Sequence, residues 1–282
     1  MNLRSVLLAL PLLLLLAGAS VSAPAPGKIP LDYPVVPTTA KAGDWVLTPP
    51  RLWLDQAFEK GVQSQTFIFY AATMVKPGAA ESTVKDLMGK EFAMPNSLIV
   101  PIRKGQKAAV GDIVLTWWQS GSGMQKSLVI QGGTPTQPKV LHLDLSYENP
   151  AGVGKKPDTL KPDTFHRLGK ALEPGTMVTF KDGSFWKAGQ VLNRTSAQVL
   201  YLGFAGRIGV VPAKACHALP VRPQGLKAGG QVMARSSLGS LQPARIAKID
   251  PAIGRVFVTF PKAGDPKKVL AVAFGDLISK LP

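Results

Sequence analysis

The chain has 282 residues, with 33 lysines and arginines, 17 aspartates and glutamates, and a formal net charge of +16 at pH 7. This positive charge favours anionic partners, and the single cysteine, Cys216, excludes an internal disulfide framework. The 25 prolines and 28 glycines interrupt the sequence too often for a mainly helical fold, so we expect many short strands.

The N-terminus has the pattern of a secretory signal peptide over residues 1–19. Arg4 gives a positive start, an apolar run covers residues 6–16, and small residues ending at Ala19 form a cleavage pattern. Because residue 19 is not cysteine, lipid anchoring through that position is excluded. We expect an exported protein, periplasmic or extracellular, with no transmembrane segment after cleavage, and an uncleaved anchor is the alternative. A Pro-rich segment, residues 20–40, follows.

Four short sequences share a glycine, two further residues, a valine and then strand-like sequence. These glycines are Gly43, Gly111, Gly175 and Gly229. Further along each repeat come a turn, a short helical or 3₁₀ piece and a closing apolar strand. The spacing is typical of small β-barrels joined by loops of unequal length. We predict four tandem SH3-like units at residues 41–103, 110–168, 174–220 and 228–282.

The first unit contains the one stretch with a helical pattern. Apolar residues three and four apart in "ESTVKDLMGKEF" predict a helix from Glu81 to Phe92. Elsewhere, runs rich in Val, Leu and aromatic residues alternate with turn-forming sequences. The predicted fold is therefore all-β, with a short helical insertion in the first unit.

The third unit contains "DGSFWKAGQV" at residues 182–191 and "VLYLGFAG" at residues 199–206. Over about 45 residues this unit resembles a Tudor domain, a member of the SH3-like barrel class. The resemblance implies an aromatic cage, which in that family holds a methylated lysine or arginine by cation–π attraction. The candidate cage residues are Phe180, Phe185, Trp186, Tyr201 and Phe204.

The sequence departs from the Tudor pattern directly after Tyr201. The family has Asp, an aromatic residue, Gly and Asn, whereas this chain has "GFAG" at residues 203–206. Both polar residues that orient a cation are missing. In a unit that is already basic, this composition is poorly suited to a cationic ligand, and core or rim packing is the alternative role of the aromatic residues.

Basic side chains form a second candidate site. The segment "PKAGDPKK", residues 261–268, predicts a hairpin loop with three lysines. A polyanion-binding face is the functional interpretation, and scattered solvated charge is the alternative. The candidate patch consists of Lys262, Lys267, Lys268, Arg245 and Arg255.

No spacing of residues predicts a catalytic site, a cofactor or a metal. The three histidines, at positions 142, 166 and 217, have no second ligand at metal-binding spacing. Cys216 and His217 are neighbours on a predicted strand and face opposite sides, so we expect Cys216 buried and His217 exposed. Asp144 and Glu148 are interpreted as a solvated loop rim.

These observations predict an exported, non-enzymatic binding or scaffold protein of the bacterial envelope or the extracellular space. The expected partner is an anionic envelope polymer or an envelope protein. A nucleic-acid-binding module and a methylated-cation-binding Tudor-like module are the alternatives. The sequence leaves the oligomeric state open.

Overall fold

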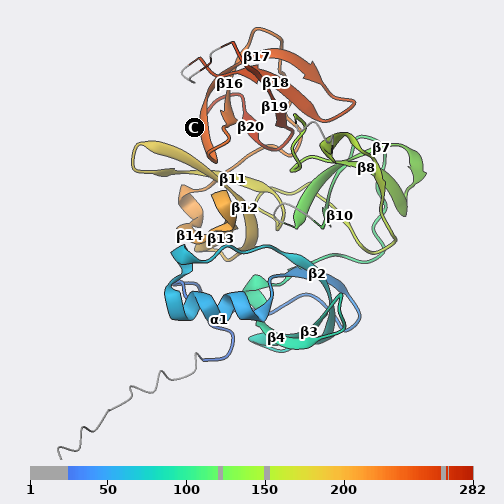
Figure 1. Cartoon of the computed structure of the whole chain (residues 1–282), viewed down its shortest axis with the longest axis vertical. Coiled ribbons are helices and arrows are strands. Elements are labelled where there is room, and N and C mark those ends of the chain that lie inside the picture. The colour runs from blue at the N-terminus through green and yellow to red at the C-terminus, as the bar shows by residue number, and fades with distance from the viewer. Residues whose placement is uncertain (1–24, 120–122, 149–152, 262–264, 266, 282) are drawn as a thin grey trace, which may run out of the picture.

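The computed structural model describes residues 25–119, 123–148, 153–261, 265 and 267–281 (Figure 1). The predicted signal peptide, residues 1–19, lies outside them. Antiparallel strands are the main secondary structure of the described residues, which confirms the all-β prediction. None of the sheets closes into a barrel in this part of the chain. No helix among the described residues is long and apolar enough to span a membrane.

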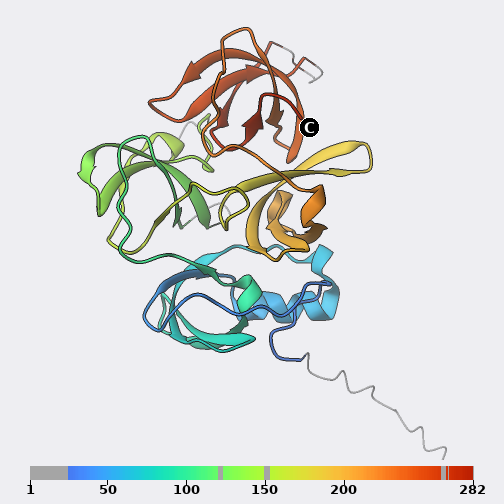
Figure 2. The ribbon, with the colours of Figure 1, turned by 180° about the vertical axis from the view of Figure 1, so that it is seen from behind.

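The described strands fall into four sets of five, which follow one another along the chain. In Figure 1 and Figure 2 the first set lies at one end of the molecule and the fourth at the other. The first two sets are β1 (Trp45–Thr48), β2 (Tyr70–Lys76), β3 (Glu81–Asp86), β4 (Glu91–Pro95) and β5 (Val100–Pro101), then β6 (Ile113–Trp117), β7 (Met124–Thr134), β8 (Gln137–His142), β9 (Asp158–Thr159) and β10 (His166–Arg167). The last two are β11 (Met177–Asp182), β12 (Phe185–Arg194), β13 (Gln198–Leu202), β14 (Ile208–Pro212) and β15 (His217–Ala218), then β16 (Gln231–Arg235), β17 (Ser240–Asp250), β18 (Arg255–Thr259), β19 (Val269–Ala273) and β20 (Leu277–Ile278).

Every set has the same antiparallel pairing order. The first four strands pair in sequence, and the fifth returns to pair with the first. Sets one and two are separate sheets, whereas sets three and four form one ten-stranded sheet because β12 also pairs with β17. At that junction Trp186 lies opposite Leu241 and Lys187 lies opposite Ser240.

The four repeated glycines occupy equivalent turns at the start of each set. All have positive φ, between 81° and 94°, which glycine adopts without a Cβ clash. The N–H of each donates to a carbonyl in the second strand of its set at 2.8 Å. The acceptors for Gly43, Gly111, Gly175 and Gly229 belong to Met74, Val129, Val191 and Ile246, respectively. The sequence repeat is therefore a repeat of backbone geometry.

The predicted helix at Glu81–Phe92 is wrong, because this segment forms a hairpin of β3 and β4. In β3 the buried residues Ser82 and Val84 alternate with more exposed ones, as expected for a strand. At the turn, Asp86 Oδ1 accepts hydrogen bonds from the N–H groups of Met88 and Lys90, both at 2.9 Å. These hydrogen bonds to the Asp86 side chain stabilise a tight turn in the segment where the apolar spacing predicts a helix.

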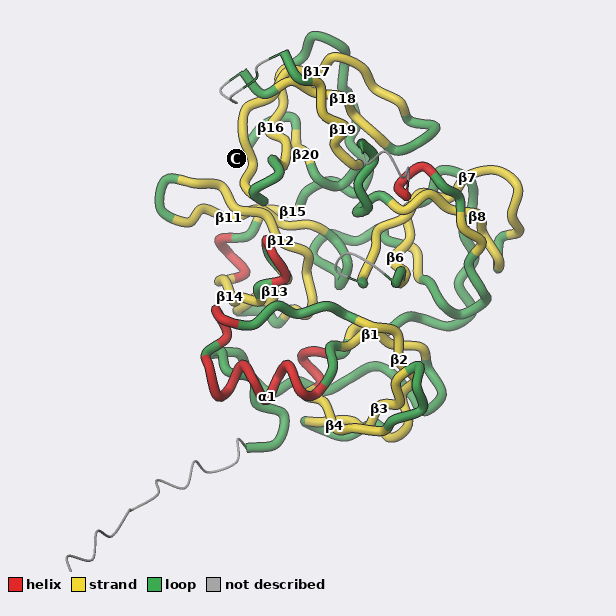
Figure 3. Tube along the Cα trace, viewed as in Figure 1, coloured by secondary structure: helices red, strands yellow, loops and turns green. Residues whose placement is uncertain are grey.

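The helical insertion in the first set lies instead at α1 (Arg51–Lys60), shown in red in Figure 3. It begins directly after Pro50 and ends at Gly61, whose φ is 84°. Leu54 and Ala57, three residues apart, are buried on one face. The remaining helices are short 3₁₀ turns: η1 (Val62–Ser64), η2 (Asn96–Leu98), η3 (Val153–Lys155), η4 (Phe204–Gly206) and η5 (Ala213–Ala215). As predicted, η2 and η5 precede the closing strands of sets one and three, but in sets two and four the chain enters β10 and β20 from turns, and the predicted short helical pieces are not formed there.

The described part of the Pro-rich segment, residues 25–40, packs onto the folded core. Ile29, Tyr33 and Ala40 are buried. The Tyr33 hydroxyl donates to Asn193 Oδ1 at 3.1 Å, and burial raises the pKa of Tyr33. This segment therefore ties the start of the described chain to the third set.

One apolar cluster extends through all four sets. It contains Met74 from the first, Leu128 from the second, Leu200 from the third and Val256 from the fourth. The sets are therefore packed against one another, in agreement with the short polar connections between them. Burial of apolar surface is the main favourable term in such packing.

A buried ion cluster joins the second and fourth sets. Lys126 Nζ lies 2.8 Å from Asp276 Oδ1 and 3.2 Å from Asp144 Oδ1, and only 2% of the Lys126 side chain is exposed. Burial by itself lowers the pKa of Lys126, but the two carboxylates raise it overall. The interpretation of Asp144 as a solvated loop residue is therefore wrong. Glu148 is exposed, as expected.

Candidate binding grooves

A groove of about 500 Å³ lies beside the junction of the third and fourth sets, and we name it the Arg207 groove. Its walls come from the hairpin of β11 and β12, from the segment that joins β13 to β14, and from the turn between β16 and β17. It is lined by Gln63, Asp182, Phe185, Lys187, Ala188, Tyr201, Gly203, Phe204, Arg207, Ile208, Leu238, Gly239 and Ser240.

The structure divides the five predicted cage residues between this groove and the interior. Phe185, Tyr201 and Phe204 line the groove. Phe180 is buried behind Tyr201, with ring centroids 4.7 Å apart. Trp186 packs against His217 at 5.8 Å between ring centroids and belongs to a different apolar cluster. Three of the five predicted residues are therefore brought together.

The rim of the Arg207 groove is unusually apolar for a surface. Phe185 is 65% exposed, Phe204 is 50% exposed, and Leu238 from the next set is 70% exposed. Large apolar side chains that are exposed to solvent and lie close together are typical of a binding surface. Leu238 was not predicted, because nothing in the sequence shows that β12 pairs with β17.

Arg207 also lines this groove, and it is not among the site residues predicted from the sequence. Its Nη1 atom is buried and has no hydrogen-bond partner among the described residues. A buried cationic N–H without an acceptor is costly, so an anionic group that reached it would be bound favourably. The other charged groups in the groove, Asp182 and Lys187, form an ion pair with each other.

The predicted basic patch is only partly assembled. Arg245 is exposed on β17 and lies in register with Thr259, which pairs in turn with Val269. Lys267 and Lys268 precede Val269 and are exposed, so these three basic residues occur at the same end of the sheet.

Arg255, another member of the predicted patch, does not lie with these three residues. Arg255 is 3% exposed and donates to the carbonyls of His142 and Leu145, both at 3.2 Å. It is a structural residue in the interface between the second and fourth sets. Lys262 lies outside the described residues.

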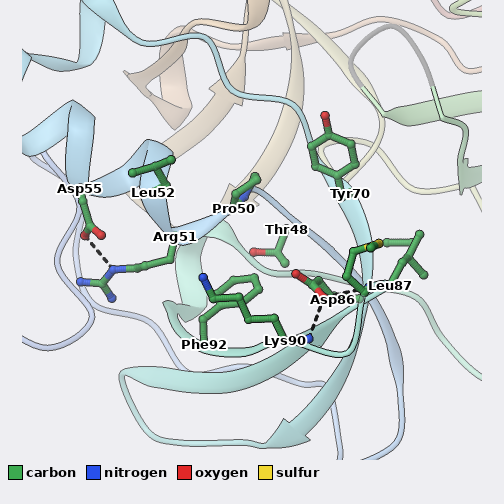
Figure 4. A pocket seen from close by; sticks show the side chains of 13 residues that line it. Thr48, Pro50, Arg51, Leu52, Asp55, Tyr70, Asp86, Leu87, Lys90 and Phe92 are labelled. Atoms are coloured by element: carbon green, nitrogen blue, oxygen red, sulfur yellow. Dashed lines mark hydrogen bonds and ion pairs between the residues drawn. The ribbon is translucent and has the colours of Figure 1, made fainter.

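A second groove, of about 570 Å³, lies on the first set between α1 and the hairpin of β3 and β4 (Figure 4). We name it the Met88 groove. Apolar side chains from both elements contribute to its walls, and Leu52 and Leu87 are labelled on opposite sides in Figure 4. It is lined by Thr48, Pro50, Arg51, Leu52, Asp55, Tyr70, Ala71, Ala72, Asp86, Leu87, Met88, Lys90 and Phe92.

The thiol and imidazole groups occupy structural positions. Cys216 and His217 are both half-buried, which differs from the expected contrast between them, and burial raises the pKa of Cys216 to about 11. Burial lowers the pKa of His166 to about 4. Within the described residues, no group of three or more His, Cys, Asp or Glu side chains is arranged to hold a metal ion. The sequence matches neither a protein-family model nor a curated protein.

Proposed function

We propose that the protein is an exported, non-enzymatic binding or scaffold protein whose Arg207 groove binds an envelope protein through a segment with an apolar and a carboxylate side chain. The observation that carries this proposal is that Arg207, whose Nη1 atom has no hydrogen-bond partner among the described residues, lines the same groove as Phe185, Phe204 and Leu238. Apolar walls give affinity to such a segment, and the guanidinium gives it a preference for negative charge.

We further propose that each five-strand set is an SH3/Tudor-like barrel unit, with the four boundaries predicted from the sequence. The common pairing order and the common glycine turn support this. A register shift in the second strand of every set also supports it, as between Met74 and Lys76 or between Val191 and Asn193. Such bulges bend strands in the way that a barrel requires.

A protein partner is favoured over an anionic polymer or a nucleic acid by the composition of the groove. A polyanion is bound mainly by positive charge, whereas this groove is lined by three exposed apolar side chains and by Arg207, whose Nη1 atom has no partner among the described residues. The remaining basic patch, Arg245, Lys267 and Lys268, is the alternative site for a polyanion.

A methylated cation is the second candidate ligand, because Asp182 lies in the groove with Phe185, Tyr201 and Phe204. This carboxylate comes from the β11–β12 turn and not from the position that the Tudor pattern uses. Its ion pair with Lys187 neutralises it, which favours the anionic ligand over the cationic one.

Three small ligands that share a phenylalkyl group and differ in the charge of the head group distinguish these possibilities. We expect 3-phenylpropionate to shift the NMR resonances of the groove more strongly than 3-phenylpropionamide, and 3-phenylpropyltrimethylammonium to shift them least. The substitution Arg207→Gln should remove the preference for the carboxylate, while Lys214→Gln, at an exposed lysine outside the groove, should preserve it. Tighter binding of the ammonium compound would instead identify a methylated-cation site.

A second measurement separates a protein partner from a polyanion. Phe204→Ala should weaken capture of the natural partner from an envelope fraction but leave binding of a DNA oligonucleotide unchanged. If the wild-type protein bound only the oligonucleotide, with a steep salt dependence, the proposed protein-binding role would be wrong.

A further inference from the structure

The Met88 groove combines a hollow with a projecting apolar tip. Nine large apolar side chains are exposed in the described part of the chain, and three of them, Leu52, Leu87 and Met88, line this groove. Met88 is 91% exposed at the tip of the β3–β4 hairpin. The hollow lies between that hairpin and α1.

We propose that the Met88 groove is a self-association surface, which binds the same surface of a second copy of this chain across a two-fold axis. A two-fold interface requires one patch to contain both a projection and the recess that receives it. Here the tip of one copy would enter the groove of the other, and its own groove would receive the partner's tip. The exposed apolar side chains of both copies would be removed from water.

Charge restricts where two copies of this protein can meet. The whole chain carries +16, and most of that excess lies in residues 174–282. Residues 41–103, which contain the Met88 groove, have seven basic and six acidic side chains. Like-charged molecules repel when their basic surfaces approach. The first set therefore offers a nearly neutral surface on which two copies can meet without that repulsion.

The charged groups that line the groove have both signs, and Arg51 already has acidic partners within the first set. The Arg51 guanidinium lies 2.8 Å from Asp55 Oδ1 and 2.8 Å from Glu81 Oε1, so it is already neutralised. Asp86 and Lys90 flank the hairpin tip with opposite charges. In a two-fold pair of antiparallel tips, Asp86 of one copy would face Lys90 of the other, and the reverse contact would form by symmetry.

The first test compares exposed apolar residues inside and outside the groove. Sedimentation equilibrium of the wild-type protein, from low to high micromolar concentration, should show a monomer–dimer equilibrium. Met88→Asp should raise the dimer dissociation constant by about tenfold or more, whereas Val110→Asp, at a residue 61% exposed outside both grooves, should leave it unchanged. A monomeric wild-type protein at every concentration, or equal effects of both substitutions, would overturn the proposal.

A double-mutant cycle then tests the two-fold arrangement. Lys90→Glu should weaken the dimer, because the new carboxylate would face Asp86 of the other copy. Asp86→Asn retains the side-chain oxygen that closes the turn and removes the charge, so adding it to Lys90→Glu should restore part of the affinity. Simply additive effects would refute the arrangement. Circular dichroism confirms folding, and unchanged 3-phenylpropionate binding shows that the Arg207 groove is unaffected.

Discussion

Replacement of Lys126 by methionine should destabilise the protein far more than the removal of a surface ion pair. Methionine preserves the apolar stem, but it leaves the carboxylates of Asp276 and Asp144, whose side chains are only 12% and 14% exposed, without their ammonium partner. Breaking a buried ion pair in this way costs about 3–5 kcal/mol. Arg235 remains 3.7 Å from Asp276 Oδ2, so we expect a loss of about 3 kcal/mol in the free energy of unfolding.

The matched control is Lys248→Met. Lys248 Nζ lies 3.2 Å from Asp250 Oδ2, the same distance as between Lys126 and Asp144, but the Lys248 side chain is 66% exposed. Its loss should cost less than about 1 kcal/mol. Urea unfolding of both variants at pH 7, monitored by tryptophan fluorescence, gives the two free energies. If Lys126→Met cost no more than Lys248→Met, the role assigned to the buried cluster would be refuted.

Three further predictions concern the remaining buried groups. Because the folded pKa of His166, about 4, lies below the ordinary 6.5, the unfolded chain binds this proton more tightly. The contribution of neutral His166 to the free energy of unfolding should therefore be fully present above pH 6.5 and fall by about 3 kcal/mol as the pH drops to 4. In His166→Gln, the free energy of urea unfolding should depend less on pH over that range. An unchanged pH dependence in this variant would contradict the assignment. Gly175→Ala should destabilise more than Gly229→Ala in thermal unfolding, because both glycines have positive φ but a Cβ at Gly175 would lie 2.7 Å from Leu115 Cδ2. Tyr33→Phe should lower the free energy of urea unfolding by about 1 kcal/mol, because the hydrogen bond to Asn193 is lost. A value equal to that of the wild-type protein would show that this hydrogen bond does not stabilise the fold.

Local backbone requirements were the most predictable part of the structure. Gly43 and its three equivalents could be found because a turn with positive φ restricts the residue type, and this restriction is visible in the sequence. The helix was placed wrongly because apolar spacing alone does not separate a short helix from a hairpin. The signals that distinguish α1 were Pro50 just before the helix and Gly61 at its end.

The grooves depend on contacts between sets, which no local pattern records. Phe185 and Phe204 could be selected as aromatic residues near turns, but Leu238 joins them only because β17 pairs with β12. The importance of Arg207 depends on the absence of an acceptor near its Nη1 atom among the described residues. Likewise, Arg255 has the sequence features of a surface residue and is buried against carbonyls of the second set.

The contact between Tyr33 and Asn193 has a consequence for the order of assembly. The two residues are 160 positions apart in the chain, and Tyr33 is made first. At a synthesis rate of about 5–20 residues per second, on the order of ten seconds pass before its partner exists. During that time residues 25–40 lack part of their docking surface. The beginning of the described chain therefore cannot reach its final position until the third set is made, and until then an intermediate that exposes it is available to chaperones or proteases.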